Sequence, residues 1–410
     1  MSAYTILQER GFIRQCTDET NLRLLLDNEI VTYYAGFDPT ADSIHAGTLV
    51  PIMAMAHLQR AGHRPIAIIG GGTTMVGDPS GKTAMRQMLS LETIEANGRG
   101  ILGQLQRYLI VDGASGLFLN NADWLLPLTY IDFLRDIGRH FRVNEMIKME
   151  AYKQRLEREE GLSFLEFNYQ LLQAYDFLLL SQRHNCALQI GGDDQWGNIL
   201  AGADLIRRVE RKSAYGLTFP LLTTARGQKM GKTEQGTIWL SAERTSPYEF
   251  YQYWINTDDR DVERFLKYFT FLPLDEIGRL AALEGSEIRE AKACLAFETT
   301  KLCHGEQQAE EARQASRAAF SNDASDFSGI PTSMVASSRL SAGIPVVDLF
   351  LETGLAESKG AARRLIQQGG AFINDVQITD VNLVVCSEVV ADGAFLLRHG
   401  KKRVHRVLVE

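Results

Sequence analysis

Strand-like and helix-like segments alternate along the first 244 residues, and this alternation most constrains the fold. Short runs rich in β-branched and apolar residues predict strands at 31–36, 64–72, 116–120 and 186–192. The longer segments between them carry apolar residues at helical spacing. Strands separated by helix-length connections pair in parallel and form an open sheet covered by helices. We therefore predict an α/β fold built on a parallel sheet.

Three polar segments begin at or near the ends of predicted strands. They read GFDPTADSIHAGTLVP (36–51), GGGTTMVGDPSGK (70–82) and QIGGDDQWGN (189–198). In an open parallel sheet the carboxyl ends of the strands converge, and ligands bind there. The first segment also leads into a helical pattern, and a helix N-terminus suits a phosphate group. The alternative is a capping segment with an incidental histidine.

Two familiar nucleotide motifs are excluded by their spacing. A phosphate-binding P-loop needs four residues between its glycines, and Gly77 and Gly81 enclose only three. The dinucleotide fingerprint is also broken, because Met75 occupies its third glycine position. A standard P-loop NTPase or dehydrogenase is therefore disfavoured.

One predicted helix carries polar residues on a single face. Tyr169, Gln173 and Asp176 stand at positions i, i+4 and i+7 within the helical pattern of 163–184. Burying these groups without partners is costly, so they form either an internal network or the wall of a pocket for a polar small molecule. A second helical pattern covers 129–147.

The chain changes character after residue 244. Residues 245–320 are helical in pattern, and 321–344 contain seven serines without a long periodic pattern, which predicts a linker. Residues 345–410 carry eight basic and eight acidic side chains, although the stretch RHGKKRVHR is locally basic. We therefore predict an α/β domain (1–244), an α-helical domain (245–320), a linker (321–344) and a small terminal domain (345–410).

The composition is that of an ordinary globular protein, with 45% hydrophobic and 23% charged residues and a net charge of −8. No run of 18 apolar residues and no signal-peptide pattern occur, so we expect a cytoplasmic protein without a membrane segment. The five cysteines are scattered, which argues against a disulfide framework and against a structural zinc site.

Taken together, the motifs resemble one family. HAGT resembles the HIGH signature of class I aminoacyl-tRNA synthetases, and KMGKT resembles their KMSKS loop. YYAGFDPTADSIHAG, GDPSGK, FNYQLLQAYDF, QIGGDDQWGN and TSPYEFYQYWINTDDRDV together resemble the bacterial tyrosyl-tRNA synthetases. The segment from PVVDLF to NDVQI resembles their S-four RNA-binding module. The resemblance implies a Rossmann-like catalytic domain with a KMSKS-type loop at 229–233, an all-α domain and an α+β S-four-like domain.

The resemblance also implies the reaction and its residues. The family activates L-tyrosine with ATP to tyrosyl-adenylate and pyrophosphate, and then transfers tyrosine to the terminal ribose of tRNA(Tyr). The resemblance implies that Tyr34 and Asp176 bind the phenol hydroxyl of the substrate. It also implies that the ammonium group of the substrate is bound by Asp78, Tyr169 and Gln173. It places Gln195 beside the carboxylate. A hydroxyl both donates and accepts, which suits a phenol and a carboxylate as its partners.

The remaining roles follow from the same resemblance. The implied ATP-binding residues are Asp38, Thr40, Gly47, Gly192, Asp194 and Lys232. The implied catalytic residues are His45, Thr48, Lys82, Arg86, Lys229, Lys232 and Thr233. The RNA-binding residues are expected to be Lys359, Arg363, Arg364, Lys401, Lys402 and Arg403. Mg²⁺ is expected to enter with ATP, and no residue is predicted to ligate a metal of the protein's own.

Three positions depart from the family pattern. Thr48 replaces the second signature histidine, Ala35 stands where relatives often have cysteine, and Thr233 replaces the usual serine of the loop. A tryptophanyl enzyme and a non-catalytic RNA-binding paralogue are the alternative functions. The family is homodimeric, and the apolar segment 133–147 is the predicted contact.

Overall fold

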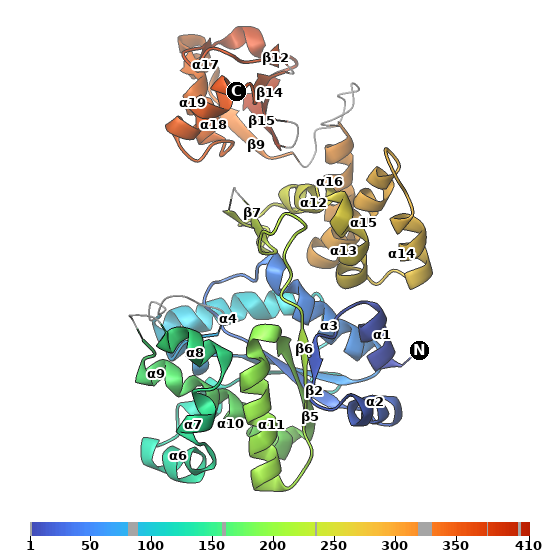
Figure 1. Ribbon diagram of the computed structural model, residues 1–410. Coiled ribbons are helices and arrows are strands. Elements are labelled where there is room, and N and C mark those ends of the chain that lie inside the picture. The colour runs from blue at the N-terminus through green and yellow to red at the C-terminus, as the bar shows by residue number, and fades with distance from the viewer. Residues whose placement is uncertain are drawn as a thin grey trace. The chain divides into compact units, whose positions relative to one another are not determined.

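The computed structural model describes residues 2–80, 89–157, 161–233, 236–318, 330–374, 376–400 and 403–410, without the side chains of residues 232 and 233. The chain forms two compact units, coloured along the chain in Figure 1. The first comprises residues 1–241 and 258–283, and the second comprises residues 242–257 and 284–410.

The first unit is built on a mixed sheet. Among the described residues, six strands are ordered β1-β6-β5-β2-β3-β4. All neighbouring pairs are parallel except β1 and β6, which are antiparallel. The strands are β1 (Gln15–Cys16), β2 (Thr32–Phe37), β3 (Arg64–Ile69), β4 (Leu117–Asn120), β5 (Cys186–Gly192) and β6 (Tyr215–Phe219). The predicted parallel sheet is confirmed, whereas the two-residue β1 is too short to leave a periodic pattern.

Helices cover the sheet and extend beyond it. The α-helices of the first unit are α1 (Ala3–Glu9), α2 (Glu19–Asn28), α3 (Leu49–Arg60), α4 (Leu91–Leu105), α5 (Ala122–Leu125), α6 (Tyr130–Asp136), α7 (Val143–Met146), α8 (Glu150–Leu156), α9 (Phe164–Phe167), α10 (Tyr169–His184), α11 (Trp196–Glu210), α13 (Val262–Phe269) and α14 (Leu274–Ala281). The 3₁₀ helices are η1 (Ala46–Thr48), η2 (Thr73–Met75), η3 (Gly138–His140), η4 (Asp193–Gln195) and η5 (Asp259–Asp261). A small hairpin joins β7 (Lys232–Thr233) and β8 (Gly236–Thr237).

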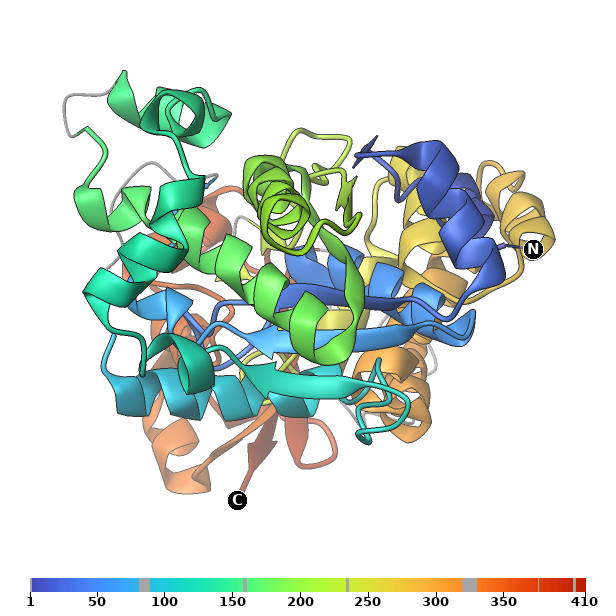
Figure 2. The same cartoon turned by 90° about the horizontal axis from the view of Figure 1, so that it is seen from below.

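Alternation along β2 separates the two faces of the sheet. Tyr33 points to α3, where its hydroxyl donates to the carbonyl of Met55. Tyr34 points to the opposite face, where its ring lies 5.3 Å from that of Phe177 on α10. Figure 2 shows α10 and α11 packed together against the sheet. The core on this side is therefore a sheet-and-helix layer that also contains the side chain of Asp176.

Both long helical patterns are interrupted in the structure. The 129–147 pattern is divided into α6, η3 and α7, because the backbone tightens at Gly138–His140 and Phe141 is extended. The 163–184 pattern is divided into α9 and α10. Ser163 and Glu166 cap α9 reciprocally, and Asn168 begins α10.

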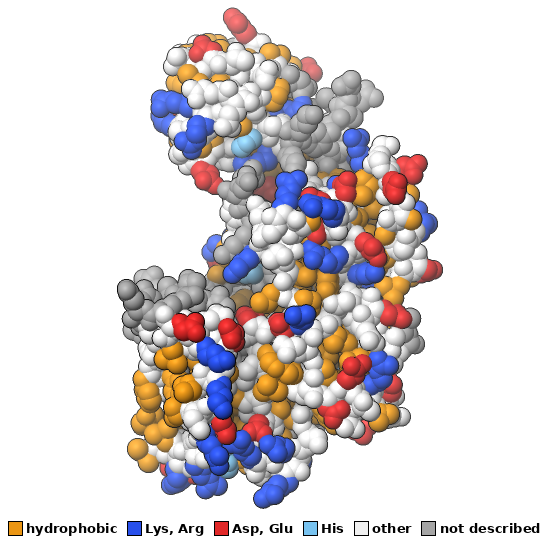
Figure 3. All heavy atoms as spheres, viewed as in Figure 1, with side chains coloured by type: hydrophobic (Ala, Val, Ile, Leu, Met, Phe, Trp, Pro, Cys, Tyr) orange, Lys and Arg blue, Asp and Glu red, His pale blue; other side chains and the backbone are white. Residues whose placement is uncertain are grey.

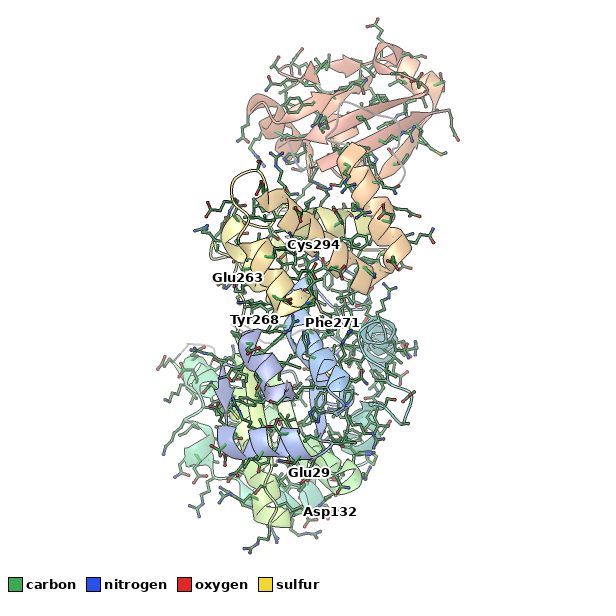
Figure 4. All side chains as sticks on the ribbon, turned by 90° about the vertical axis from the view of Figure 1, so that its right-hand side faces the viewer. Glu29, Asp132, Glu263, Tyr268, Phe271 and Cys294 are labelled. Carbon is green, nitrogen blue, oxygen red and sulfur yellow. The ribbon has the colours of Figure 1, made fainter. Side chains whose placement is uncertain are left out.

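Helices α13 and α14 belong to the first unit, although they fall within the predicted α-helical domain. The guanidinium of Arg10 donates to the carbonyls of Lys267, Thr270 and Leu272. Tyr268 donates to the carbonyl of Gly11 over 2.6 Å. Figure 4 labels Tyr268 at this junction with the N-terminal helices. A helical pattern alone does not reveal which unit a helix packs against.

The second unit contains helices and a separate sheet. Its helices are α12 (Pro247–Ile255), α15 (Ile288–His304), α16 (Glu306–Ala318), α17 (Ser337–Ala342), α18 (Val346–Glu352), α19 (Lys359–Gln367) and the 3₁₀ helix η6 (Ser387–Val389). The strands of its larger sheet, in spatial order, are β12 (Val376–Gln377), β11 (Ala371–Ile373), β14 (Ala394–His399), β15 (Arg403–Val409) and β9 (Thr332–Val335). The short strands β10 (Ile344–Pro345) and β13 (Val384–Val385) form a separate pair.

The predicted linker overlaps this folded part. Strand β9 pairs in parallel with β15, and Leu340 of α17 is fully buried in the core of the terminal domain. Ordered structure therefore begins before residue 345, because Val335, Leu340 and Ile344 supply core contacts that periodicity does not reveal. The part of the predicted linker from residue 321 to residue 329 lies outside the described residues. The four-part domain division otherwise stays a prediction.

Over the described parts of the chain, no helix is both long enough and apolar enough to cross a membrane. All five cysteines are free thiols.

Candidate active site

Three of the predicted site residues, Asp38, Tyr169 and Asp176, belong to one set of hydrogen bonds. Residues at the carboxyl ends of β2 and β4 take part in it. Asn121, which follows β4, donates to Asp176 on α10 and to Thr73 on η2, each over 3.0 Å. Thr73 donates to Asp38, which follows β2, and Tyr169 donates to the other oxygen of Asp38 over 3.1 Å. Hydrogen bonds therefore connect four elements that are distant in sequence.

Asp176 is a buried carboxyl with strong donors. Its side chain is 4% exposed, and the indole N–H of Trp124 donates to it over 2.7 Å in addition to the Asn121 bond. Burial raises the pKa of Asp176 to about 7, while these two hydrogen bonds act in the opposite direction. Each of its oxygens accepts one of these bonds, and a carboxylate oxygen can accept a second one from a ligand.

Tyr34 lies on the same face of the sheet as Asp176. Burial raises the pKa of Tyr34 well above its usual value, and the charge of Asp176 raises it further. Within the described structure, the hydroxyl of Tyr34 is buried without a hydrogen-bond partner. A buried hydroxyl without a partner is costly, so a polar ligand atom at this position would be stabilised.

A second hydrogen-bonded set contains Asp78, one of the predicted ammonium contacts, and Gln195, the predicted neighbour of the carboxylate. Gln195 on η4 donates to Asp78 over 2.7 Å, and Asn198 on α11 donates to the amide oxygen of Gln195 over 3.1 Å. The backbone N–H of Ser80 donates to the other oxygen of Asp78. The carboxylate of Asp78 is therefore fixed in direction before any substrate binds.

The HAGT segment and the MGKT loop approach each other closely. A β-carbon added to Gly47 would lie 2.5 Å from the carbonyl oxygen of Met230. A β-carbon on Gly231, whose φ is +77°, would lie 2.5 Å from the nitrogen of Gly47. The backbone N–H of Ala46 donates to the carbonyl of Ile238, which continues this contact. Only glycine permits this approach of two backbones.

The other predicted residues of the first unit are placed as follows. Gln173 is half-buried on α10, and Thr40 is exposed, with its N–H donating to the carbonyl of Asp38. Gly192 ends β5, and burial followed by the charge of Asp78 raises the pKa of Asp194. Thr48 ends η1 and is the N-cap residue of α3, without a side-chain capping bond.

The basic residues are less completely described. His45 forms an isolated β-bridge with Trp239, and the side chain of Lys229 is exposed. Lys82 and Arg86 lie outside the described residues, as do the side chains of Lys232 and Thr233. The cationic part of the site therefore stays a prediction.

The predicted RNA-binding residues of the second unit differ in their surroundings. Arg363 and Arg364 are exposed on α19, whereas Lys359 forms a 2.7 Å ion pair with Asp348. Arg403 donates to the carbonyl of Gly354, and burial lowers its pKa. Lys401 and Lys402 lie outside the described residues.

Four residues of the two hydrogen-bonded sets were not predicted as site residues from the sequence: Thr73, Asn121, Trp124 and Asn198. Asn121 directly follows β4, so the convergence of strand ends was the signal that could have identified it. Trp124 is one turn further on and gives no separate signal.

Two models of known protein families match this chain, one after the other along the sequence. A family model described as "tRNA synthetases class I (W and Y)" matches residues 26–321. This chain belongs to that family. A model of the tyrosine–tRNA ligase C-terminal domain matches residues 324–407.

The relatives resemble the chain over its whole length. Tyrosine–tRNA ligases of Clostridium botulinum and Desulfosudis oleivorans are each 54% identical, covering 100% of this chain and 100% and 99% of their own. A truncated mitochondrial tyrosyl-tRNA synthetase of Aspergillus nidulans matches with a TM-score of 0.71 and 32% identity, covering 78% of this chain and 94% of its own. The class I synthetase fold predicted from the motifs is thus confirmed.

Proposed function

We propose that this chain is an ATP-dependent tyrosine–tRNA ligase. The single observation that carries the amino-acid assignment is the buried pair of Tyr34, whose hydroxyl has no partner among the described residues, and Asp176. A substrate phenol can donate to the carboxylate and accept from the tyrosine, which satisfies both groups. The 54% identity to tyrosine–tRNA ligases over the full chain supports the same substrate.

Activation begins with orientation of the tyrosine. The ammonium group would be held by Asp78, Tyr169 and Gln173, and Gln195 would lie near the carboxylate. The substrate carboxylate oxygen attacks the α-phosphorus of ATP, a P–O bond forms, and the bond to the leaving pyrophosphate breaks. No residue of the chain becomes covalently attached, so catalysis consists of positioning and charge stabilisation.

Negative charge grows on the phosphoryl oxygens and on pyrophosphate. His45, Lys82, Arg86, Lys229, Lys232 and the hydroxyls of Thr48 and Thr233 are the proposed donors to this charge. Asp38, Thr40, Gly47, Gly192 and Asp194 would contact ATP. Among the described residues no cluster of three or more His, Cys, Asp or Glu suits a metal ion. Mg²⁺ would enter with ATP, bound to its phosphates.

The second step transfers tyrosine to a tRNA. The ribose hydroxyl attacks the adenylate carbonyl, and AMP leaves. Exposed Arg363 and Arg364 on α19 are the described residues best placed to contact RNA phosphates. A cytoplasmic location, expected from the sequence, remains part of this proposal.

We also propose a homodimer. Large apolar side chains are exposed along the segment 126–165, and they are Leu126, Tyr130, Ile131, Val143, Ile147, Leu156, Phe164 and Leu165. Figure 3 shows hydrophobic side chains gathered over these helices. A patch of this kind marks a protein contact. It includes part of the predicted contact segment 133–147.

Pyrophosphate exchange tests the function directly. The full-length protein is incubated with ATP, Mg²⁺ and labelled pyrophosphate, and with tyrosine, tryptophan or no amino acid. Exchange with tyrosine alone supports the proposal. Exchange with tryptophan alone would assign the sister activity, and no exchange with either amino acid would support a non-catalytic RNA-binding protein.

A further inference from the structure

Asp193 lies in the GGDDQ turn and contacts side chains of the edge strands β1 and β6. Its carboxylate accepts a 2.6 Å hydrogen bond from the side-chain amide of Gln15 and a 2.9 Å bond from the hydroxyl of Thr218. Both donors reach the same oxygen. The second oxygen lies 3.6 Å from Nε of Arg14.

The two donors are themselves neighbours. Gln15 of β1 and Thr218 of β6 are directly paired across the antiparallel edge of the sheet. The backbone N–H of Arg14 donates to the carbonyl of Thr218, and Thr218 is completely buried. Asp193 is thus bound to a fixed, two-stranded platform rather than to a mobile side chain.

The last residue of the same turn is hydrogen-bonded within the candidate active site. Asp194 and Gln195 complete η4, and Gln195 donates to Asp78 in the candidate active site. In a single 3₁₀ turn, the directions of consecutive side chains are coupled through the backbone. Fixing Asp193 on one side therefore fixes the directions available to Asp194 and Gln195 on the other.

We infer that Asp193 is a positioning residue that holds the η4 turn against β1 and β6, so that Asp194 and Gln195 are oriented for ATP and tyrosine. This inference rests on the proposed function of the site, because it uses the roles assigned to those two residues. Strand β1 would then influence substrate binding through Asp193, although none of the proposed substrate contacts lies on β1.

The hydrogen bonds, rather than the ion pair, carry the effect. The side chain of Arg14 is 64% exposed, and an exposed pair at 3.6 Å contributes little. The bonds from Gln15 and Thr218 are charge-assisted and at least partly buried. We therefore expect Asp193→Asn, which keeps an oxygen acceptor, to retain more function than Asp193→Ala.

The test measures KM and kcat for ATP and tyrosine in pyrophosphate exchange. Asp193→Ala is expected to raise KM for ATP on the order of tenfold and to raise KM for tyrosine less, with kcat changed about twofold or less. Gln15→Met should give a smaller change in the same direction. Because Gln15 acts through Asp193, the double variant should add nothing to Asp193→Ala.

Asp204→Asn is the matched control. Asp204 pairs with Arg207 and Arg208 on the surface of α11, so its loss removes ion pairs without touching η4. Thermal unfolding of every variant separates positioning from support of the fold. A lower melting temperature with unchanged KM values in Asp193→Ala would mean a purely structural role and would overturn the inference.

Failure of the proposed function and failure of this inference would give different results. A wild-type protein without tyrosine-dependent exchange would refute the proposed function and this inference with it. An active wild type whose KM values survive both Asp193→Ala and Gln15→Met would refute the inference alone. If Asp193→Ala does not fold, Asp193→Asn and Gln15→Met decide the question by the same constants.

Discussion

Replacing Tyr34 by phenylalanine should stabilise the free protein and weaken its selection for tyrosine. In the structure the Tyr34 hydroxyl is buried and has no hydrogen-bond partner within the described residues. An unsatisfied buried polar group costs about 1–3 kcal/mol. Removing it while keeping the ring against Phe177 therefore relieves part of this cost.

The functional loss follows from the same atom. A neutral hydrogen bond between the Tyr34 hydroxyl and a substrate phenol contributes about 0.5–1.5 kcal/mol, which is roughly a twofold to tenfold factor in kcat/KM. Phenylalanine lacks the phenol and loses nothing when Tyr34 is changed. The ratio of kcat/KM for tyrosine to that for phenylalanine should therefore narrow by about this factor, while Asp176 maintains the remaining preference.

Two measurements check this prediction. Pyrophosphate exchange with tyrosine and with phenylalanine gives the ratio, and thermal unfolding gives the stability change. An increase of about 1 kcal/mol raises the melting temperature by about 2–4 °C in a unit of this size. Tyr33→Phe is the matched control, because the hydroxyl of Tyr33 donates to the carbonyl of Met55 on the other face. That variant should lose stability and leave the ratio unchanged.

The reasoning would be refuted by an unchanged ratio in Tyr34→Phe, which would mean that the phenol is held elsewhere. A melting temperature lowered as much as in Tyr33→Phe would show that the Tyr34 hydroxyl is satisfied in the free protein.

Three further predictions concern other parts of the molecule. Burial raises the pKa of Asp176 to about 7, so the folded state binds a proton that the unfolded state loses. The free energy of unfolding should therefore fall as pH rises from about 4 to about 7. Urea titrations of Asp176→Asn should show a weaker dependence of this free energy on pH. Gly231→Ala would collide with a backbone nitrogen and should lower the rate of adenylate formation in stopped-flow measurements while tyrosine affinity is kept. Gly227→Ala has a similar φ of +80° but open space, and it should be milder. Changing Arg363 and Arg364 together to alanine should weaken tRNA charging and reduce its salt dependence, with pyrophosphate exchange unaffected; equal loss of both activities would contradict this.

The sequence by itself determined the class of fold and the identity of most proposed site residues. Short β-branched and apolar runs and the longer helical patterns are local properties, so they predicted β2 to β5 and the convergence of their ends. The spacing i, i+4 and i+7 on α10 likewise placed Tyr169, Gln173 and Asp176 on one face. Local chemistry is legible in the sequence because it depends on residues close together in the chain.

Only the tertiary structure decided which side chains hold those residues in place. Asn121 and Trp124 reach Asp176 across more than 50 positions, and Gln15 reaches Asp193 across 178. Strand β1 is two residues long and exists because β6 offers it an edge. Arg10 donates to carbonyls of α13 and of the segment that follows it, and these bonds help to hold this part of the chain in the first unit. These contacts have no local period, since the folded sheet alone brings their partners together.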